Sequence, residues 1–325
     1  MRPRLITVTI FLAVSTFLVF CAGIAVGDYP LGLTEVIRAL AGDGDRFALL
    51  TVRELRLPRE LVGLLVGAAF GISGAVFQTV TRNPLASPDM IGIAAGASMA
   101  VVMAILLNVN IPTFGLLGAL ATAAVIYLLA WRRGATGYRI VLVGVGVTWV
   151  CVSVTNYLLS RAKLHEAQAA LGWLVGSVNG RTWSTVPPLA VAMGVLVPVV
   201  VLGGRWLRTL QLGDEVAIGL GTPVNLARLV LLGAGVGLVA FGTAAAGPIA
   251  FVALAAPQLA QRLAGLPAPP PLVSGLTGSL IVLGSDLVAR RLLPDVQLPV
   301  GVVTGALGAP FLLWLLIVAN RRLTA

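Results

Sequence analysis

Residues 56–97 read RLPRELVGLLVGAAFGISGAVFQTVTRNPLASPDMIGIAAGA, and this stretch decides the fold. Its first half is an apolar run with glycines at Gly63, Gly67, Gly71 and Gly74. Small residues at this spacing let two helix backbones approach closely in lipid, where packing drives helix association. The run stops at a polar turn, Arg82-Asn83-Pro84, and a second apolar segment follows it. The stretch therefore predicts two membrane helices joined by a short turn.

The composition of the whole chain agrees with this interpretation. The 325 residues are 58% hydrophobic and only 10% charged, whereas soluble domains carry about 25% charged residues. At about 20 residues per spanning helix, the chain holds about ten helices in a single transmembrane domain, residues 1–325. The predicted fold is all-α and polytopic, with spans at 5–26, 60–80, 91–108, 113–131, 139–160, 187–203, 227–246, 248–264, 273–290 and 299–319.

The basic residues at the two chain ends predict the orientation. Arg2 and Arg4 place the N-terminus in the cytoplasm by the positive-inside rule, and an even number of spans returns Arg321 and Arg322 to the same side. Both termini are thus predicted to be cytoplasmic. The first external segment, residues 27–58, is too polar to cross a bilayer, and we expect an amphipathic helix over residues 33–41 within it.

Arginines gather at the external ends of the predicted spans, at Arg53, Arg56, Arg59, Arg290 and Arg291. One interpretation is that their long side chains reach the lipid headgroups. The other is a docking surface for an acidic partner, because complementary charge guides encounter and fixes register. Asp286 lies one helical turn before Arg290, so these two side chains are expected to pair.

The cytoplasmic loop over about residues 204–226 is too polar to span the membrane. Acidic residues follow Gly213, which suits the start of a helix, and Gly221 suits its end. Such a helix, lying along the membrane surface, could receive force from a soluble partner, or it could be a plain surface helix. In the apolar run that follows Gly247, Pro257 is expected to kink or break the helix.

Several function classes lack their signatures. We find no phosphate-binding loop of the form GxxxxGK[ST], no nucleophile with a base, no metal-ligand spacing and no sign of nucleic-acid binding. The predicted spans hold almost no ionisable residues, whereas ion-coupled transporters place them at mid-membrane. By elimination, a permease driven by a separate ATPase is favoured. A self-contained secondary transporter and a channel-like or structural protein are the alternatives.

Several motifs, in order along nearly the whole chain, resemble the iron-chelate permeases of bacterial ATP-binding-cassette (ABC) importers, the FecCD-type family that includes cobalamin and ferric-siderophore permeases. The motifs are Arg56-Leu57-Pro58-Arg59, Gly67-Ala68, Ser73-Gly74, Gln78, Arg82-Asn83-Pro84-Leu85-Ala86, Pro88, Gly92, Trp173-Leu174-Val175-Gly176-Ser177, Leu212-Gly213-Asp214-Glu215, Gly247-Pro248-Ile249-Ala250-Phe251, Leu298-Pro299-Val300-Gly301 and Gly308-Ala309-Pro310.

This resemblance implies a type II importer permease of ten helices in the bacterial cytoplasmic membrane. The implied partners are a second permease, identical or homologous, two ATPases that bind ATP and Mg²⁺, and a periplasmic or lipid-anchored substrate-binding protein. No catalytic residue, metal or cofactor is expected in this chain itself. The implied site residues are, for binding-protein docking, Arg56, Arg59 and Arg290; for ATPase coupling, Leu212, Gly213, Asp214, Glu215, Ala217 and Gly221; and as structural motifs, Arg82, Asn83, Pro84, Gly247, Pro248 and Pro257.

Two positions depart from the family pattern. Gln258 follows Pro257 where histidine is common, which resembles the ferric-catecholate siderophore branch and favours iron chelates over cobalamin or haem. Gln297 stands where an acidic residue often precedes Leu-Pro, which removes one possible charge partner near Arg290.

Overall fold

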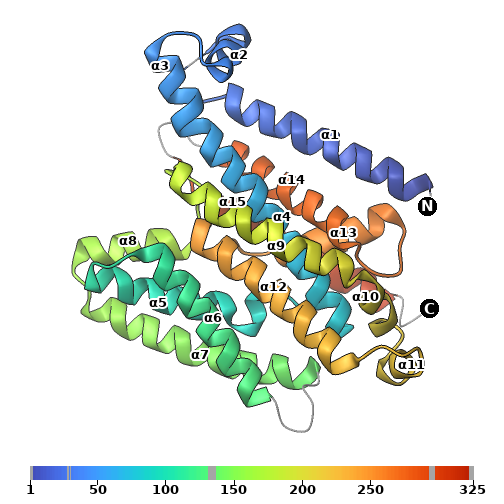
Figure 1. Cartoon of the computed structure of the whole chain (residues 1–325). Coiled ribbons are helices and arrows are strands. Elements are labelled where there is room, and N and C mark those ends of the chain that lie inside the picture. The colour runs from blue at the N-terminus through green and yellow to red at the C-terminus, as the bar shows by residue number, and fades with distance from the viewer. Residues whose placement is uncertain (1–2, 28, 30, 131–136, 293–296, 322–325) are drawn as a thin grey trace.

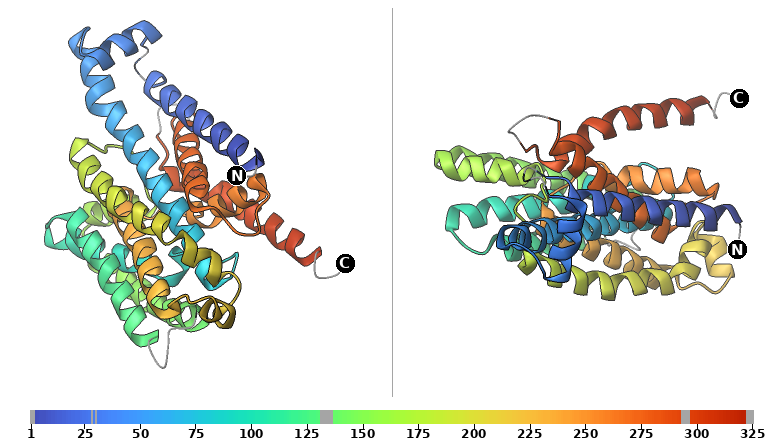
Figure 2. Two further views of the ribbon diagram at one scale, coloured as in Figure 1. Left: turned by 45° about the vertical axis from the view of Figure 1, so that its right-hand side comes forward. Right: turned by 90° about the horizontal axis from the view of Figure 1, so that it is seen from above.

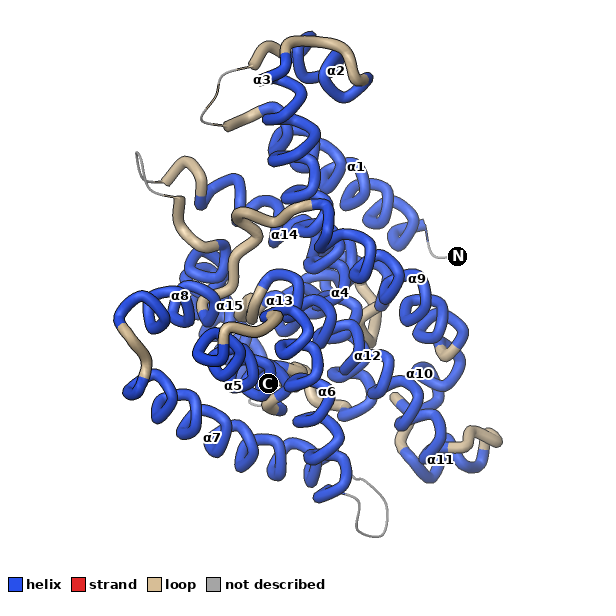
Figure 3. Tube along the Cα trace, turned by 60° about the vertical axis from the view of Figure 1, so that its left-hand side comes forward, coloured by secondary structure: helices blue, strands red, loops and turns tan. Residues whose placement is uncertain are grey.

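The computed structural model describes residues 3–27, 29, 31–130, 137–292 and 297–321. Within these ranges the chain forms helices joined by loops, and no strand is present (Figures 1 and 3). The all-α prediction is therefore confirmed. Arg2 and Arg322, which the orientation argument used, lie outside the described residues, as does the side chain of Arg321.

Seven helical segments in the described part of the chain are long and apolar enough to cross a membrane. They are α1 (Pro3–Ala25), α4 with its N-terminal extension (Arg46–Thr81), α6 (Ile111–Ala130), most of α7 (Gly137–Arg161), α9 with the preceding 3-10 turn (Trp183–Leu202), α12 (Val224–Ala246) and α14 (Pro271–Ala289).

The other three predicted spans are also helices, but their apolar parts are short. They are α5 (Ile93–Leu107), α13 (Val252–Ala264) and α15 (Val300–Arg321), which is strongly apolar only to Trp314. A helix of 15 residues, such as α5, is about 22 Å long, against about 30 Å of bilayer hydrocarbon. All ten predicted spans therefore coincide with helices, while the number of membrane crossings stays a prediction.

The central helix begins earlier than predicted. The segments α3 (Arg46–Leu49), η1 (Leu50–Arg56) and α4 (Leu57–Thr81) run on as one helix of 36 residues, whereas the sequence placed the start of the span at residue 60. The connecting element η1 is π-helical, and the Leu57 N–H donates to the Val52 carbonyl across its wide turn. Because this wide turn comes directly before Pro58, the helix continues through the proline instead of starting after it.

Helix α4 lies at the centre of the bundle and packs against α14, α12 and α13 (Figure 1). Three glycines of the predicted ladder lie where α4 meets α14: a Cβ on Gly67 would lie 2.5 Å from the Gly278 carbonyl oxygen, and one on Gly71 would collide with the Ser274 carbonyl. The fourth, Gly74, packs against the Ala253 backbone of α13. Only residues without a side chain allow this backbone-to-backbone contact. The interpretation of the ladder as a helix-packing surface is confirmed.

The two ends of the bundle carry different short elements (Figures 1 and 2). At one end lie α2 (Leu33–Ala41), which matches the expected amphipathic helix, and α8 (Leu164–Leu174). At the other lie α10 (Gly204–Leu210), α11 (Asp214–Gly219), the start of α1 and the end of α15. Arg4 Nε donates to the Leu263 carbonyl at 2.9 Å, so the start of α1 is fixed against the end of α13. We refer below to the α2 end and the α11 end.

The break in the apolar run after α12 falls at residues 247–251, not at Pro257. Gly247 has φ +77° and Phe251 has φ +66°, and neither conformation continues a right-handed helix. Helix α13 then begins at Val252, four residues later than predicted, and contains Pro257 without ending there. Of the two expected outcomes, a break of the helix at Pro257 is therefore wrong, and a kink there stays a prediction.

Candidate functional site

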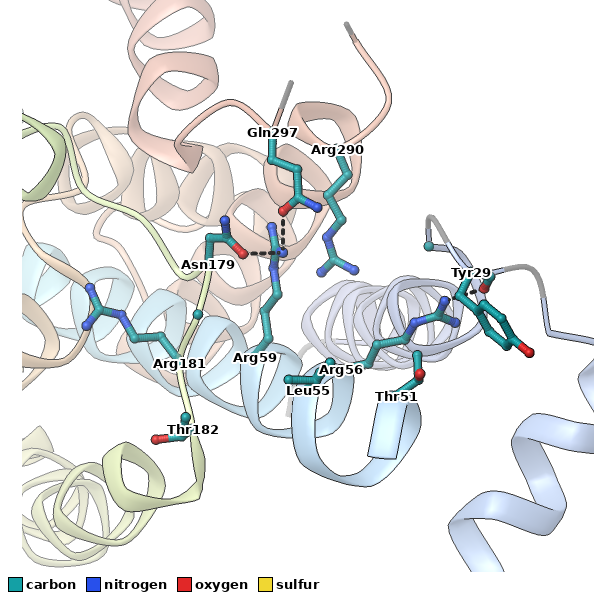
Figure 4. A pocket seen from close by; sticks show the side chains of 12 residues that line it. Tyr29, Thr51, Leu55, Arg56, Arg59, Asn179, Arg181, Thr182, Arg290 and Gln297 are labelled. Carbon is teal, nitrogen blue, oxygen red and sulfur yellow. Dashed lines mark hydrogen bonds between the residues drawn. The ribbon is translucent and has the colours of Figure 1, made fainter. Parts of the chain in front are cut away.

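A pocket of about 330 Å³ opens at the α2 end of the bundle (Figure 4). It lies where the α1–α2 connection, η1, the start of α4, the loop after α8 and the end of α14 meet. Its lining residues are Gly27, Tyr29, Thr51, Leu55, Arg56, Arg59, Asn179, Gly180, Arg181, Thr182, Arg290 and Gln297. The structure thus brings the three predicted docking arginines into one pocket, from positions up to 234 residues apart in the chain.

Arg59 is held by three other segments. Its Nε and Nη2 donate to the two carboxylate oxygens of Asp286 at 3.1 and 2.8 Å, a bidentate ion pair between α4 and α14. Its Nη1 donates to Asn179 Oδ1 at 2.9 Å and to Gln297 Oε1 at 3.1 Å. Arg59 is 8% exposed and Asp286 2%. The Arg59 guanidinium therefore joins the elements of the pocket wall.

Arg290 shares the same carboxylate. Its Nε donates to Asp286 Oδ2 at 2.9 Å, and its Nη2 pairs with both Asp286 and Glu60. The expected pairing of Asp286 with Arg290 is confirmed. Gln297 Oε1 accepts a hydrogen bond from Arg59 at 3.1 Å, and Arg290 pairs with Asp286 and Glu60. The sequence analysis did not identify Glu60, although it directly follows Arg59 and therefore lies at the same end of the helix.

Arg56 closes the end of α1. Its Nη1 donates to the carbonyl oxygens of Ile24 at 2.9 Å and Ala25 at 3.0 Å, and its Nη2 donates to the Tyr29 carbonyl at 2.6 Å. The last carbonyls of a helix lack partners within the helix and carry its partial negative charge, so a guanidinium there stabilises the helix end. Arg56 is 6% exposed. All three predicted docking arginines are therefore largely buried at the pocket.

At the α11 end, the predicted coupling loop forms α10, the short helix α11 and the start of α12. Gly213 and Gly221, which flank α11, have φ +103° and +77°, a conformation that side chains disfavour. Asp214 binds Arg228 of α12 through both oxygens, at 2.7 and 2.9 Å, and lies 3.5 Å from Arg82 at the end of α4. One carboxylate therefore ties α11 to both long helices.

The two faces of α11 differ. Ala217 is fully buried and packs in a cluster with residues of α4, α10 and α12. Leu212, Val216, Ile218 and Leu220 are 49 to 63% exposed at this end. Among the predicted coupling residues, Ala217 thus supports the helix from inside, and Leu212 lies on the exposed apolar face. The sequence analysis did not name Val216, Ile218 and Leu220, because a helix of six residues is too short for its hydrophobic pattern to show which face is exposed.

The resemblance implied two further structural motifs. The Arg82-Asn83-Pro84 turn follows α4, and the Gly247-Pro248 segment connects α12 to α13. Arg82 ends α4 with φ +54°, and Asn83 Oδ1 accepts the Leu85 N–H at 2.9 Å, which fixes the turn. Pro84 lines a second cavity, of about 470 Å³, at the same end. A Cβ on Gly247 would lie 2.7 Å from the Trp173 carbonyl, so only glycine allows this approach between the α12–α13 connection and α8.

The second cavity also receives the side chain of Gln258, the departure noted above. Gln258 Nε2 donates to Gln78 Oε1 at 2.6 Å, and Gln78 Nε2 donates to the Leu254 carbonyl at 3.1 Å. This chain of hydrogen bonds joins α4 to α13 in a buried position. Across the described residues, no three His, Cys, Asp or Glu side chains come together as a metal site.

Comparison with known proteins gives matches over nearly the full length of the chain. The model of the FecCD transport family matches residues 15–318. A ferric enterobactin transport system permease protein of Escherichia coli is 40% identical, with 92% of each chain covered. An iron(3+)-hydroxamate import system permease protein of Bacillus subtilis is 35% identical, with 98% of each chain covered.

A solved structure agrees with the sequence relatives. An inward-facing conformation of a putative metal-chelate type ABC transporter superposes with a TM-score of 0.81 at 25% identity, covering 94% of this chain and 97% of that chain. The resemblance deduced from the motifs is confirmed. This helical membrane protein belongs to the FecCD transport family of permeases.

Proposed function

We propose that the chain is the transmembrane permease subunit of an ABC importer and passes a ferric siderophore across the bacterial cytoplasmic membrane. The observation that carries the proposal is the similarity to the enterobactin permease, which extends over 92% of both chains at 40% identity. The names of several relatives refer to iron chelates, including hydroxamate and citrate, and this favours an iron chelate over cobalamin or haem.

The proposal includes ten membrane crossings with both termini in the cytoplasm. The α11 end then faces the cytoplasm, and the α2 end faces outward. The acids Glu60 and Asp286 support a driven permease over an ion-coupled carrier, because both are engaged by arginines at the outer end and neither stands alone at mid-membrane.

Separate ATPase subunits would bind ATP and Mg²⁺ and dock on α11. The exposed side chains on and beside this helix, Leu212, Val216, Ile218 and Leu220, offer an apolar surface of the kind that partner grooves bury. Asp214 connects this surface to Arg82 on α4 and Arg228 on α12. A displacement of α11 by the ATPase would therefore reach two long helices directly, as rigid-body switching requires.

A substrate-binding protein would dock at the outer pocket, and a second permease, identical or homologous, would complete the path. The test is co-purification of the chain from its native membrane, followed by mass identification of the associated subunits. We expect an ATPase to be recovered, with a homologous second permease if the pair is a heterodimer. Recovery of the chain without any ATPase under mild detergent conditions would contradict the proposal.

A further inference from the structure

The π-helical turn before α4 leaves one backbone carbonyl without a donor from its own helix. In a π-helix a carbonyl pairs with the N–H five residues further on, and for Arg53 that residue is Pro58, which has no N–H. The α-helical partner of Arg53 would be the Leu57 N–H, but this group donates to the Val52 carbonyl. Because backbone carbonyls need a donor, the Arg53 carbonyl depends on a group outside η1 and α4.

The indole of Trp183 supplies this donor. Trp183 begins η3 (Trp183–Thr185), 130 residues after Arg53 in the chain. Its Nε1 donates to the Arg53 carbonyl at 2.8 Å, and an indole N–H can act only as a donor. This hydrogen bond therefore compensates, from a distant segment, for the N–H that Pro58 lacks.

The segment that carries Trp183 is itself held in place. Before it, the Ser177 N–H donates to the Ala246 carbonyl at 2.7 Å, which attaches the segment to the end of α12. After it, η3 continues directly into α9 (Val186–Leu202), and α9 packs against α12 and α4. The indole N–H is thus presented to η1 from a fixed position.

The register of η1 determines which of its side chains face the outer pocket. Thr51 and Leu55 line the pocket, whereas Val52 and Ala48 are buried on another side, in a cluster with residues of α1 and α2 (Figure 4). A change from the π-helical to an α-helical register shifts the preceding residues by one position. Such a shift would turn their side chains by about 100° around the helix axis.

We propose that Trp183 is a positioning residue of the outer pocket, which holds η1 in its π-helical register through the Arg53 carbonyl. In an α-helical register the Leu57 N–H would return to Arg53, and Trp183 would lose its acceptor. The hydrogen bond therefore favours the register that keeps Thr51 and Leu55 in the pocket wall. The inference rests on the proposed function, because it takes this pocket as the face that meets the binding protein.

The first test is hydrogen–deuterium exchange of the assembled importer in lipid nanodiscs, read by mass spectrometry over residues 50–57. Trp183→Phe keeps an aromatic ring but removes the N–H, and we expect several-fold faster exchange of this segment. Trp149→Phe is the matched control, because Trp149 is 67% exposed on α7, and it should leave the exchange unchanged. Equal exchange in Trp183→Phe and the native importer would overturn the inference.

A second substitution separates the N–H of Trp183 from the packing of its ring. Pro58→Ala restores a backbone N–H at position 58, so the helix no longer needs an outside donor for its carbonyls. In this background we expect Trp183→Phe to have little further effect on exchange, a non-additive result that shows the two positions act on one hydrogen bond. An undiminished effect of Trp183→Phe in Pro58→Ala would overturn the inference, because Trp183 would then act only by packing.

The same preparations test the consequence for the pocket. We expect Trp183→Phe to weaken the affinity for the binding protein recovered from the same membrane by about threefold to tenfold, as the loss of one hydrogen bond does. Trp149→Phe should not change it. Faster exchange with unchanged affinity would overturn the positioning role and leave the proposed function intact. A native importer that binds no such protein would contradict the proposed function, while the exchange rates would still decide whether Trp183 fixes the register.

Discussion

Asp286 is the residue on which the outer end of the bundle depends most. It accepts hydrogen bonds from Arg59 and Arg290 in a buried position, and so joins α4 to α14. Removing one partner of a buried ion pair leaves an uncompensated charge and costs about 3–5 kcal/mol. In Asp286→Asn two arginines lose that charge partner together. We expect a clear fall in the melting temperature of the detergent-solubilised protein.

Glu54→Gln is the matched control, because Glu54 is exposed on the same continuous helix and surface charges contribute little to stability. Equal melting temperatures for Asp286→Asn and the native chain would show that the ion cluster contributes nothing to stability.

At the scale of single elements, the contact between α4 and α14 makes Gly71 intolerant of any side chain. A Cβ there would collide with the Ser274 carbonyl, whereas a Cβ on Gly284 of α14 would meet nothing within 4 Å. We expect Gly71→Ala to destabilise the protein by about 1–3 kcal/mol through overpacking. Gly284→Ala should be neutral or slightly stabilising, because alanine favours the helix. Thermal unfolding of both variants measures the difference, and equal midpoints would contradict the close contact.

Helix α11 has a prediction of its own. Ile218 is 63% exposed on its outer face, so Ile218→Ser should keep the fold but weaken ATPase docking and reduce ATP-driven uptake. Leu226→Ser is the matched control, because Leu226 is 51% exposed in the neighbouring first turn of α12. Ala217 is unsuitable for this test, since any larger side chain there would disrupt the interior. Equal ATPase retention in both variants would exclude α11 as the docking element.

At the scale of the whole molecule, the sequence alone was sufficient to predict the features that arise from patterns along the chain. The apolar runs located the helices, the glycine spacing identified a helix-packing face on α4 without naming the helix that packs there, and the motif series identified the family. Contacts between distant residues could not be predicted this way. Arg59 and Asp286 are 227 residues apart, so no local pattern relates them. The motifs implied docking arginines without indicating that Arg59 and Arg290 pair with buried carboxylates of the chain itself.

The sequence also could not predict which side chains of a short helix point into the protein and which are exposed. Ala217 and Ile218 are adjacent apolar residues, yet one is buried and the other is 63% exposed. A helix of six residues completes less than two turns, so its hydrophobic pattern is too short to show which face packs inward. The sequence also did not predict that the helix extends before Pro58, because a proline usually marks the start of a helix.

The most direct test of the central claim is uptake of a radiolabelled ferric siderophore into proteoliposomes. The complex recovered from the native membrane is compared with the purified chain alone, each with ATP or with an imposed ion gradient. The account predicts uptake only by the complex, only with its binding protein and hydrolysable ATP. Uptake by the purified chain alone under an ion gradient would contradict it, because the chain would then be a self-contained transporter.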